Sequence, residues 1–177
     1  MTKRLRDPLL VLVAFASTAF VASCTDSTEA VPSVICGTRV DPNITHRLVE
    51  LGSFREQNRV NRSEATSAPC TLLSGKDPVI RMHFWWADGQ VDLKYMAEQA
   101  GGVSRVANAR KIDFTYDTLV GNDGAVAATQ CSSKAGDHFA LTVQFPEINL
   151  TDQTHRNDIE KFMRAYFPAT VKTLGCA

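Results

Sequence analysis

Two segments of the sequence alternate apolar and polar residues with a period of two, and this pattern constrains the fold more than any other feature. Successive side chains of a β-strand point to opposite faces, so the alternation predicts strands with one buried face. Burial on one side is typical of antiparallel sheets. The apolar positions are Ile80, Met82, Phe84 and Trp86 in residues 78–86, and Phe139, Leu141, Val143 and Phe145 in residues 138–145.

Turn-forming residues and shorter apolar runs predict the rest of the sheet. The turn at 74–77 joins residues 70–73 to 78–86 as a hairpin, and 121–124 is expected to be a second turn. Further strands are expected over 54–60, 111–117 and 125–131.

Two segments carry the signals of a helix start. The pair Asp41-Pro42 is typical of one, because the carboxylate accepts from exposed N–H groups and proline fits the first turn. A helix is therefore expected over 42–51. Asp92 is expected to cap a second helix, which ends at the glycines 101–102.

The C-terminal helix has the longest apolar stripe. It is expected to begin at Thr151 or Asp152 and to be kinked or interrupted at Pro168 before it ends at Gly175. Its apolar residues are Ile159, Phe162, Met163, Tyr166, Phe167, Val171 and Leu174. The order of elements predicts an α+β fold, with a mostly antiparallel sheet of about five or six strands flanked by helices.

The N-terminal residues have the order of an export signal. Positive charge within residues 3–6 precedes an uncharged stretch over 8–23, which is short for a membrane-spanning helix. The motif Val-Ala-Ser-Cys at 21–24 resembles the lipobox of bacterial lipoproteins. The resemblance implies that a signal peptide, residues 1–23, is removed and that the Cys24 thiol receives a diacylglycerol. The alternative is an ordinary secretory signal followed by a cysteine that carries no lipid.

A lipid-anchored protein of this kind would lie on the extracytoplasmic side of the cell membrane. Residues 24–35 are then the lipidated cysteine and a short polar tether, and residues 36–177 form a single domain. The membrane, reached through Cys24, is the first expected partner.

The chain has five cysteines, and a lipid on Cys24 leaves four. Four cysteines in an oxidising compartment predict two disulfides, for which three connectivities exist. We expect Cys36–Cys176, which would join the two ends of the domain, and Cys70–Cys131, which lie at the ends of predicted strands. A metal site is the rival explanation, but no Cys-x-x-Cys motif supports it.

Neither charge nor motifs point to a familiar chemistry. The 19 basic and 19 acidic side chains balance, and no basic stripe favours nucleic acid as a partner. No nucleophile elbow, phosphate-binding loop or His-Glu-x-x-His motif is present in the sequence. No catalytic residue, cofactor or metal site is therefore predicted.

Arg81, His83 and Trp85 are the candidate ligand-binding residues. They share the predicted strand face opposite the apolar set, where an exposed tryptophan could stack on a sugar or an apolar ligand. The alternative, which we favour, is that a helix covers this face and makes Trp85 part of the core. Trp86 is expected in the core in either case.

Two further stretches, residues 36–42 and 159–168, resemble small actinobacterial lipoproteins of uncharacterised function. Some lipoproteins of this kind have a sheet between helices, and the resemblance implies that arrangement here. It implies no catalytic residue, because no catalytic motif accompanies it.

The expected function is that of a membrane-anchored binding or interaction module, acting as a monomer on a small molecule, a lipid or an envelope protein. One alternative is an envelope hydrolase that gathers His83 or His138 with a carboxylate such as Asp113. The other is a structural accessory protein with a filled core and no pocket.

Overall fold

The computed structural model describes residues 30–58, 60–99 and 105–176. The predicted signal peptide and Cys24 lie outside the described residues, as does the predicted end of the second helix at 101–102. Among the described residues, no helix is both long enough and apolar enough to cross a membrane.

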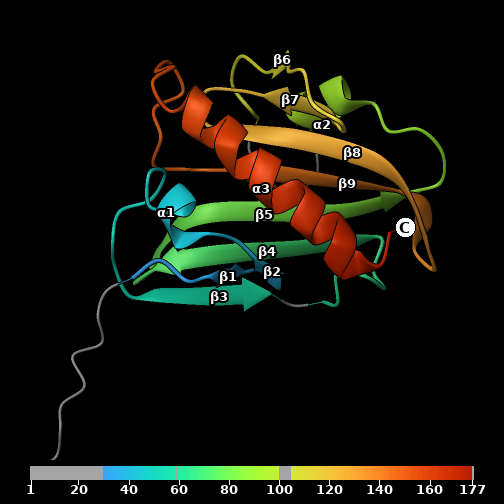
Figure 1. Cartoon of the computed structure of the whole chain (residues 1–177), viewed down its shortest axis with the longest axis horizontal. Helices are drawn as coiled ribbons and strands as arrows, with labels where there is room; N and C mark the ends of the chain where they lie inside the picture. The colour runs from blue at the N-terminus through green and yellow to red at the C-terminus, as the bar shows by residue number, and fades with distance from the viewer. Residues whose placement is uncertain (1–29, 59, 100–104, 177) are drawn as a thin grey trace, which may run out of the picture.

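A seven-stranded antiparallel sheet forms the centre of the molecule, with strand order β3-β4-β5-β9-β8-β7-β6 (Figure 1). The strands are β3 (Phe54–Asn58), β4 (Ser67–Ser74), β5 (Asp77–Ala87), β6 (Arg110–Lys111), β7 (Asp117–Val120), β8 (Gly124–Ser133) and β9 (Gly136–Gln144). The α+β class and the antiparallel sheet are confirmed, but the sheet has more strands than the five or six expected.

Helix α3 (Arg156–Leu174) packs its apolar stripe on one face of the sheet, as its spacing predicted. Phe167 stacks on Phe139 of β9 with ring centroids 5.8 Å apart, and Phe162 meets Phe145 edge-on at 5.5 Å. The predicted core positions of β5, including Trp86, point to this same face and are buried.

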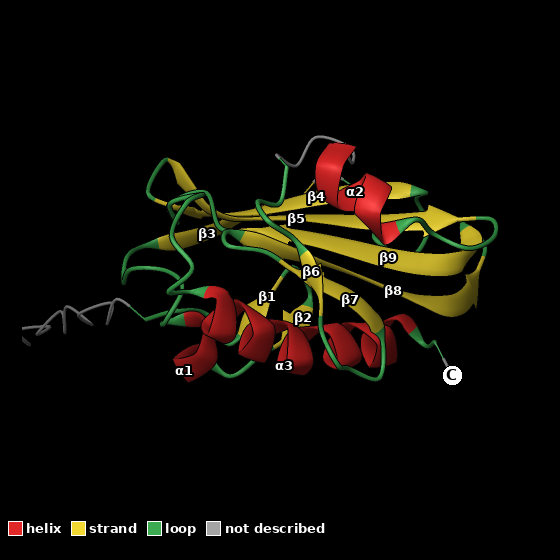
Figure 2. Cartoon of the chain, turned by 90° about the horizontal axis from the view of Figure 1, so that it is seen from above, coloured by secondary structure: helices red, strands yellow, loops and turns green. Residues whose placement is uncertain are grey.

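Two small elements share this face with α3. They are the hairpin of β1 (Val34–Ile35) and β2 (Thr38–Arg39), and the single turn α1 (Pro42–Thr45). Figure 2 shows β1 and β2 between the sheet and α3. Val31 and Ile35 are buried in the core, so the folded part begins within the segment expected to be a tether.

Helix α2 (Leu93–Gln99) covers the opposite face of the sheet (Figure 2). Asp92 caps it as predicted, because its carboxylate accepts from the backbone N–H groups of Lys94 and Tyr95. The helix closes a second, smaller apolar cluster, formed by Met96, Ala97, Val106, Val126, Ala128 and Ala140.

The predicted strand over 111–117 is wrong. Only the two-residue β6 and the later β7 pair with the sheet, and the residues between them cross the edge of α3 instead. Tyr116 meets Phe167 edge-on at 5.0 Å, and the Arg164 guanidinium lies 5.0 Å above the Phe114 ring. The aromatic residues whose alternation predicted a strand therefore pack against helix α3 instead.

The predicted helix boundaries need correction. Helix α1 ends at Thr45, and the residues up to 51 form turns. Helix α3 begins at Arg156, because the side chains of Asn149 and Asp152 accept from backbone N–H groups two residues on and close separate turns. Helix α3 is not interrupted at Pro168.

The four cysteines form two disulfides, but both predicted pairings are wrong. The bonds are Cys36–Cys70, with Cα atoms 6.0 Å apart, and Cys131–Cys176, with Cα atoms 4.9 Å apart. The β1–β2 turn lies against β4, and the end of α3 lies beside β8. Each cysteine therefore meets a partner that the prediction assigned to the other bond.

Candidate functional site

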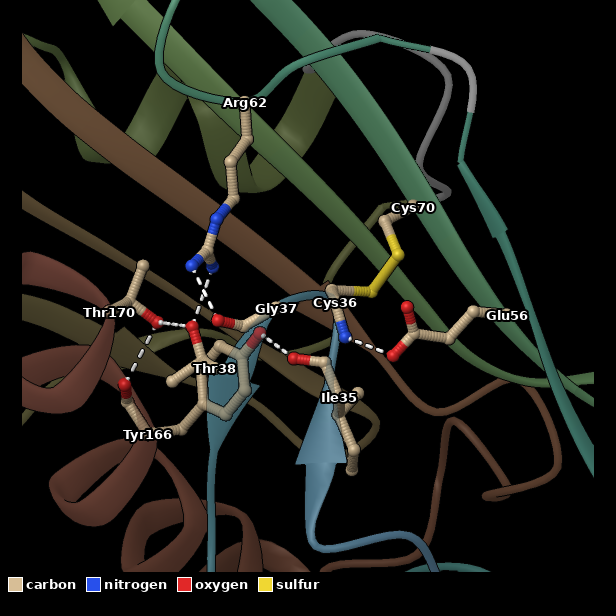
Figure 3. Close-up of a disulfide and its surroundings, with 9 residues drawn as sticks. All are labelled: Ile35, Cys36, Gly37, Thr38, Glu56, Arg62, Cys70, Tyr166 and Thr170. Atoms are coloured by element: carbon tan, nitrogen blue, oxygen red, sulfur yellow. Dashed lines mark hydrogen bonds between the residues drawn. A yellow bond between two sulfur atoms is a disulfide. The ribbon is translucent and has the colours of Figure 1, made fainter. Parts of the chain in front are cut away.

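A small pocket lies where the β1–β2 turn meets β4, β5 and the segment that follows β3. Its volume is about 180 Å³. Asn58, Asn61 and Arg62 line its polar side, and Val60, Ala68 and Phe84 line its apolar side together with the Cys36–Cys70 disulfide. Figure 3 shows this disulfide and the Arg62 side chain that extends toward the β1–β2 turn.

Two hydrogen bonds and a ring contact hold the Arg62 guanidinium in place. One terminal nitrogen, Nη1, donates to Oγ1 of Thr38 at 2.6 Å, and the other, Nη2, donates to the carbonyl of Gly37 at 2.6 Å. The guanidinium carbon lies 5.3 Å from the centre of the Phe84 ring. The backbone is held as well, because its carbonyl accepts from Nε1 of Trp86 at 2.8 Å.

The charge of Arg62 is only partly compensated. Burial lowers the pKa of its guanidinium, although an arginine stays protonated in such a setting. Within the described residues, Arg62 forms no ion pair with a carboxylate. The Glu56 carboxylate acts on it at longer range and is itself occupied, since it accepts from the Cys36 N–H at 2.5 Å.

The base of this region is a buried polar contact between the β1–β2 hairpin and α3. The Tyr166 hydroxyl donates to the Ile35 carbonyl at 2.8 Å, and the hydroxyls of Thr38 and Thr170 lie 3.0 Å apart (Figure 3). Burial raises the pKa of Tyr166 well above its ordinary value, so the phenol is neutral and gives Arg62 no countercharge.

Comparisons with protein-family models, with curated proteins and with solved structures found no match. Function must therefore be inferred from the residues of the site. Within the described ranges, no group of three or more His, Cys, Asp and Glu side chains is arranged to hold a metal ion.

The structure brings together two of the three predicted ligand-binding residues. Nε2 of His83 lies 2.6 Å from Oγ of Ser67, and the His83 ring meets Trp85 edge-on at 5.2 Å. Arg81 lies farther along the same strand face, opposite Gln144 of β9. All three side chains face the α2 side of the sheet rather than the pocket of Arg62.

The surroundings of Trp85 favour the alternative in which a helix covers this face. Its side chain is half-buried and packs against the apolar cluster beneath α2. His83 is buried with 3% of its surface exposed. A ligand-binding role for these residues stays a prediction.

The structure does not bring His83 and Asp113 together, but it places His138 beside a carboxylate. His83 lies on the α2 face of the sheet, whereas the Asp113 carbonyl accepts from Arg164 of α3 on the opposite face. The His138 ring pairs with its neighbour Asp137 at 2.8 Å, at the start of β9.

A larger hollow of about 680 Å³ lies between residues 46–51 and 147–155. Its lining mixes both signs of charge, since Arg47 lies beside Glu50, Glu147 and Asp152. The three carboxylates outnumber the one arginine, so this lining has an excess of negative charge and would repel an anion. The pocket of Arg62 differs, because a cation, Arg62, is the one charged residue of its described lining.

Sequence reasoning missed Arg62 altogether. The residue lies in a turn without periodic pattern, and its partners Gly37 and Thr38 are distant in the sequence. The cysteines were the available signal, since the Cys36–Cys70 bond is what joins these two segments. Because Cys36 was expected to bond with Cys176, the cysteines did not predict that the β1–β2 turn lies beside Arg62.

Proposed function

We propose that the protein is a membrane-anchored extracytoplasmic lipoprotein that acts as a binding module, with the pocket beside Arg62 as its ligand site. The pocket carries the proposal, because it combines a fixed cationic donor with an apolar wall. Sites for small ligands typically combine a mainly apolar lining with a few placed polar groups.

The two disulfides support the extracytoplasmic location, since such bonds persist in oxidising compartments. The lipid anchor rests on the resemblance of residues 21–24 to a lipobox. Two or more acyl chains on Cys24 would hold the protein firmly on the membrane.

The anchor would place the pocket near the membrane surface. Val31 is already packed in the core, so residues 25–30 alone would separate Cys24 from the fold. Six extended residues span at most about 20 Å. Cys36 and Gly37, which line the pocket, follow Val31 by five and six residues, so at most about 20 Å of chain separates them from Val31.

Fractionation of cells tests the anchor. The full chain should be found in the membrane fraction in its processed form, and Cys24→Ser should be released or remain unprocessed. Normal processing and membrane retention of Cys24→Ser would refute the lipoprotein assignment.

Native mass spectrometry of the full chain, purified from membranes in mild detergent, tests the binding role. We expect an adduct of defined mass. Val60→Trp should remove it, because Val60 is 45% exposed and lines the pocket, where an indole would fill the space. Val34→Trp is the matched control, since Val34 is 42% exposed and lies outside the pocket. An adduct that survives Val60→Trp, or no adduct on any variant, would contradict a ligand site here.

A further inference from the structure

We infer that the pocket beside Arg62 binds a small organic carboxylate, with the carboxylate on the guanidinium and a short apolar tail against Val60. This inference rests on the proposed function and adds the chemical class of the ligand.

The charge of the lining is the first argument. Among the described residues, Arg62 is the one charged residue that lines the pocket, and it has no carboxylate partner there. A cation removed from water loses hydration, and a bound anion would restore the lost interaction. A neutral or cationic ligand would leave this charge unmatched.

The geometry of the guanidinium is the second argument. Its hydrogen bonds to Thr38 and Gly37 use one hydrogen on each terminal nitrogen. Each of these nitrogens has a further hydrogen, and Nε–H donates to no described residue. The planar fork of an arginine suits the two oxygens of a carboxylate. Because the fork is already held in place, binding would cost little side-chain entropy.

The size and the apolar wall indicate the rest of the ligand. A volume of about 180 Å³ equals that of roughly six water molecules in the liquid. This space suits a carboxylate head and a short tail, not a drug-sized molecule. Val60 is exposed and offers the tail an apolar surface, whereas Ala68 and Phe84 are buried and form the floor beneath it.

Replacement of Glu56 tests the inference, because it should change the affinity for a carboxylate in a known direction. Its carboxylate raises the pKa of Arg62 through its charge, so the same charge repels an incoming anion. Glu56→Gln keeps an oxygen that accepts from the Cys36 N–H and removes this repulsion. We expect it to tighten carboxylate binding by about twofold at low salt, and less as salt screens the charge.

The experiment is an NMR titration of the ¹⁵N-labelled full chain in lipid nanodiscs with hexanoate, with 1-hexanol and hexylammonium as probes of equal tail length. The Trp86 indole N–H reports binding, because it donates to the Arg62 carbonyl. We expect hexanoate to shift this resonance and to bind at least tenfold more tightly than either other probe. Arg62→Gln and Val60→Trp should abolish the shift, and Val34→Trp should retain it.

The outcomes separate the ligand class from the proposed function. If hexanol binds as tightly as hexanoate and Val60→Trp blocks both, the pocket is a ligand site but the carboxylate inference fails. If no probe binds and the purified protein carries no adduct, both fail. Should Arg62→Gln not fold, Glu56→Gln decides alone, because unchanged or weaker hexanoate binding would overturn the inference.

Discussion

Asp123 is the residue whose loss should most clearly weaken the sheet. Sequence analysis placed it in an ordinary turn, but it is fully buried in the structure. One carboxylate oxygen accepts from the Ala107 N–H at 2.7 Å, and the other accepts from Nε2 of Gln144 at 3.0 Å. Asp123 therefore joins the end of β9 to the segment before β6.

Replacement of Asp123 by alanine leaves these two donors without their acceptor. Each buried donor that loses its partner costs about 1–3 kcal/mol, so Asp123→Ala should lower the free energy of unfolding by roughly 2–6 kcal/mol. Asp123→Asn should cost less. Oε1 of Gln144 is buried and has no partner among the described residues, so a rotated Gln144 amide could accept from the new amide.

Urea unfolding followed by tryptophan fluorescence measures both variants. With a slope of about 1–3 kcal/mol per molar urea, Asp123→Ala should lower the midpoint by at least about 0.7 M. Asp117→Ala is the control, because its side chain is 62% exposed and its ion pair with Lys111 lies at the surface. A midpoint for Asp123→Ala within error of that control would refute the reasoning, as would a greater loss for Asp123→Asn.

Three further predictions concern other parts of the fold. Joint replacement of Cys36 and Cys70 by serine should cost about 4 kcal/mol by the chain-entropy estimate for a separation of 34 residues, measured by urea unfolding; an unchanged midpoint would contradict it. Phe162→Ala should cost about 3–5 kcal/mol, because a fully buried ring leaves a cavity, and calorimetry should show a lower Tm. The hydrogen bond from His138 is the main cause that lowers the pKa of Asp137 in the folded state. This bond therefore stabilises the fold at a pH above the ordinary pKa of an aspartate, and the stabilisation is lost as the pH falls through the lowered pKa. His138→Gln should move the carboxyl titration, followed by NMR, toward the ordinary value; no movement would exclude this cause.

The strands that were predicted correctly are those whose pattern matches their burial. In β5 and β9 the apolar positions face α3, so period-two alternation identified both strands. The other face of β9 is buried as well, at Ala140, Thr142 and Gln144, which the alternation did not predict. Helix α3 was predicted for the same reason, because the helical spacing of its apolar residues matches the face that it buries. These elements fix the sheet, the helix and the α+β class.

The errors arose where a residue depends on contacts far away in the sequence. Phe114 and Tyr116 alternate like strand residues, but Tyr116 packs on α3 and Phe114 lies beneath Arg164. The cysteine pairing failed similarly, because Cys36 belongs to a hairpin whose position against β4 has no local signal. Local periodicity describes which face is apolar and does not say which distant segment covers it.

The candidate site depends wholly on contacts between residues that are far apart in the sequence. Arg62 becomes a fixed donor only because Gly37 and Thr38 reach it, and they do so because the Cys36–Cys70 bond holds the hairpin beside β4. The buried Tyr166 holds the same hairpin from the α3 side through the Ile35 carbonyl. Stabilisation of the fold and placement of the guanidinium thus use the same contacts, so loss of the disulfide should weaken carboxylate binding even under conditions where the chain remains folded.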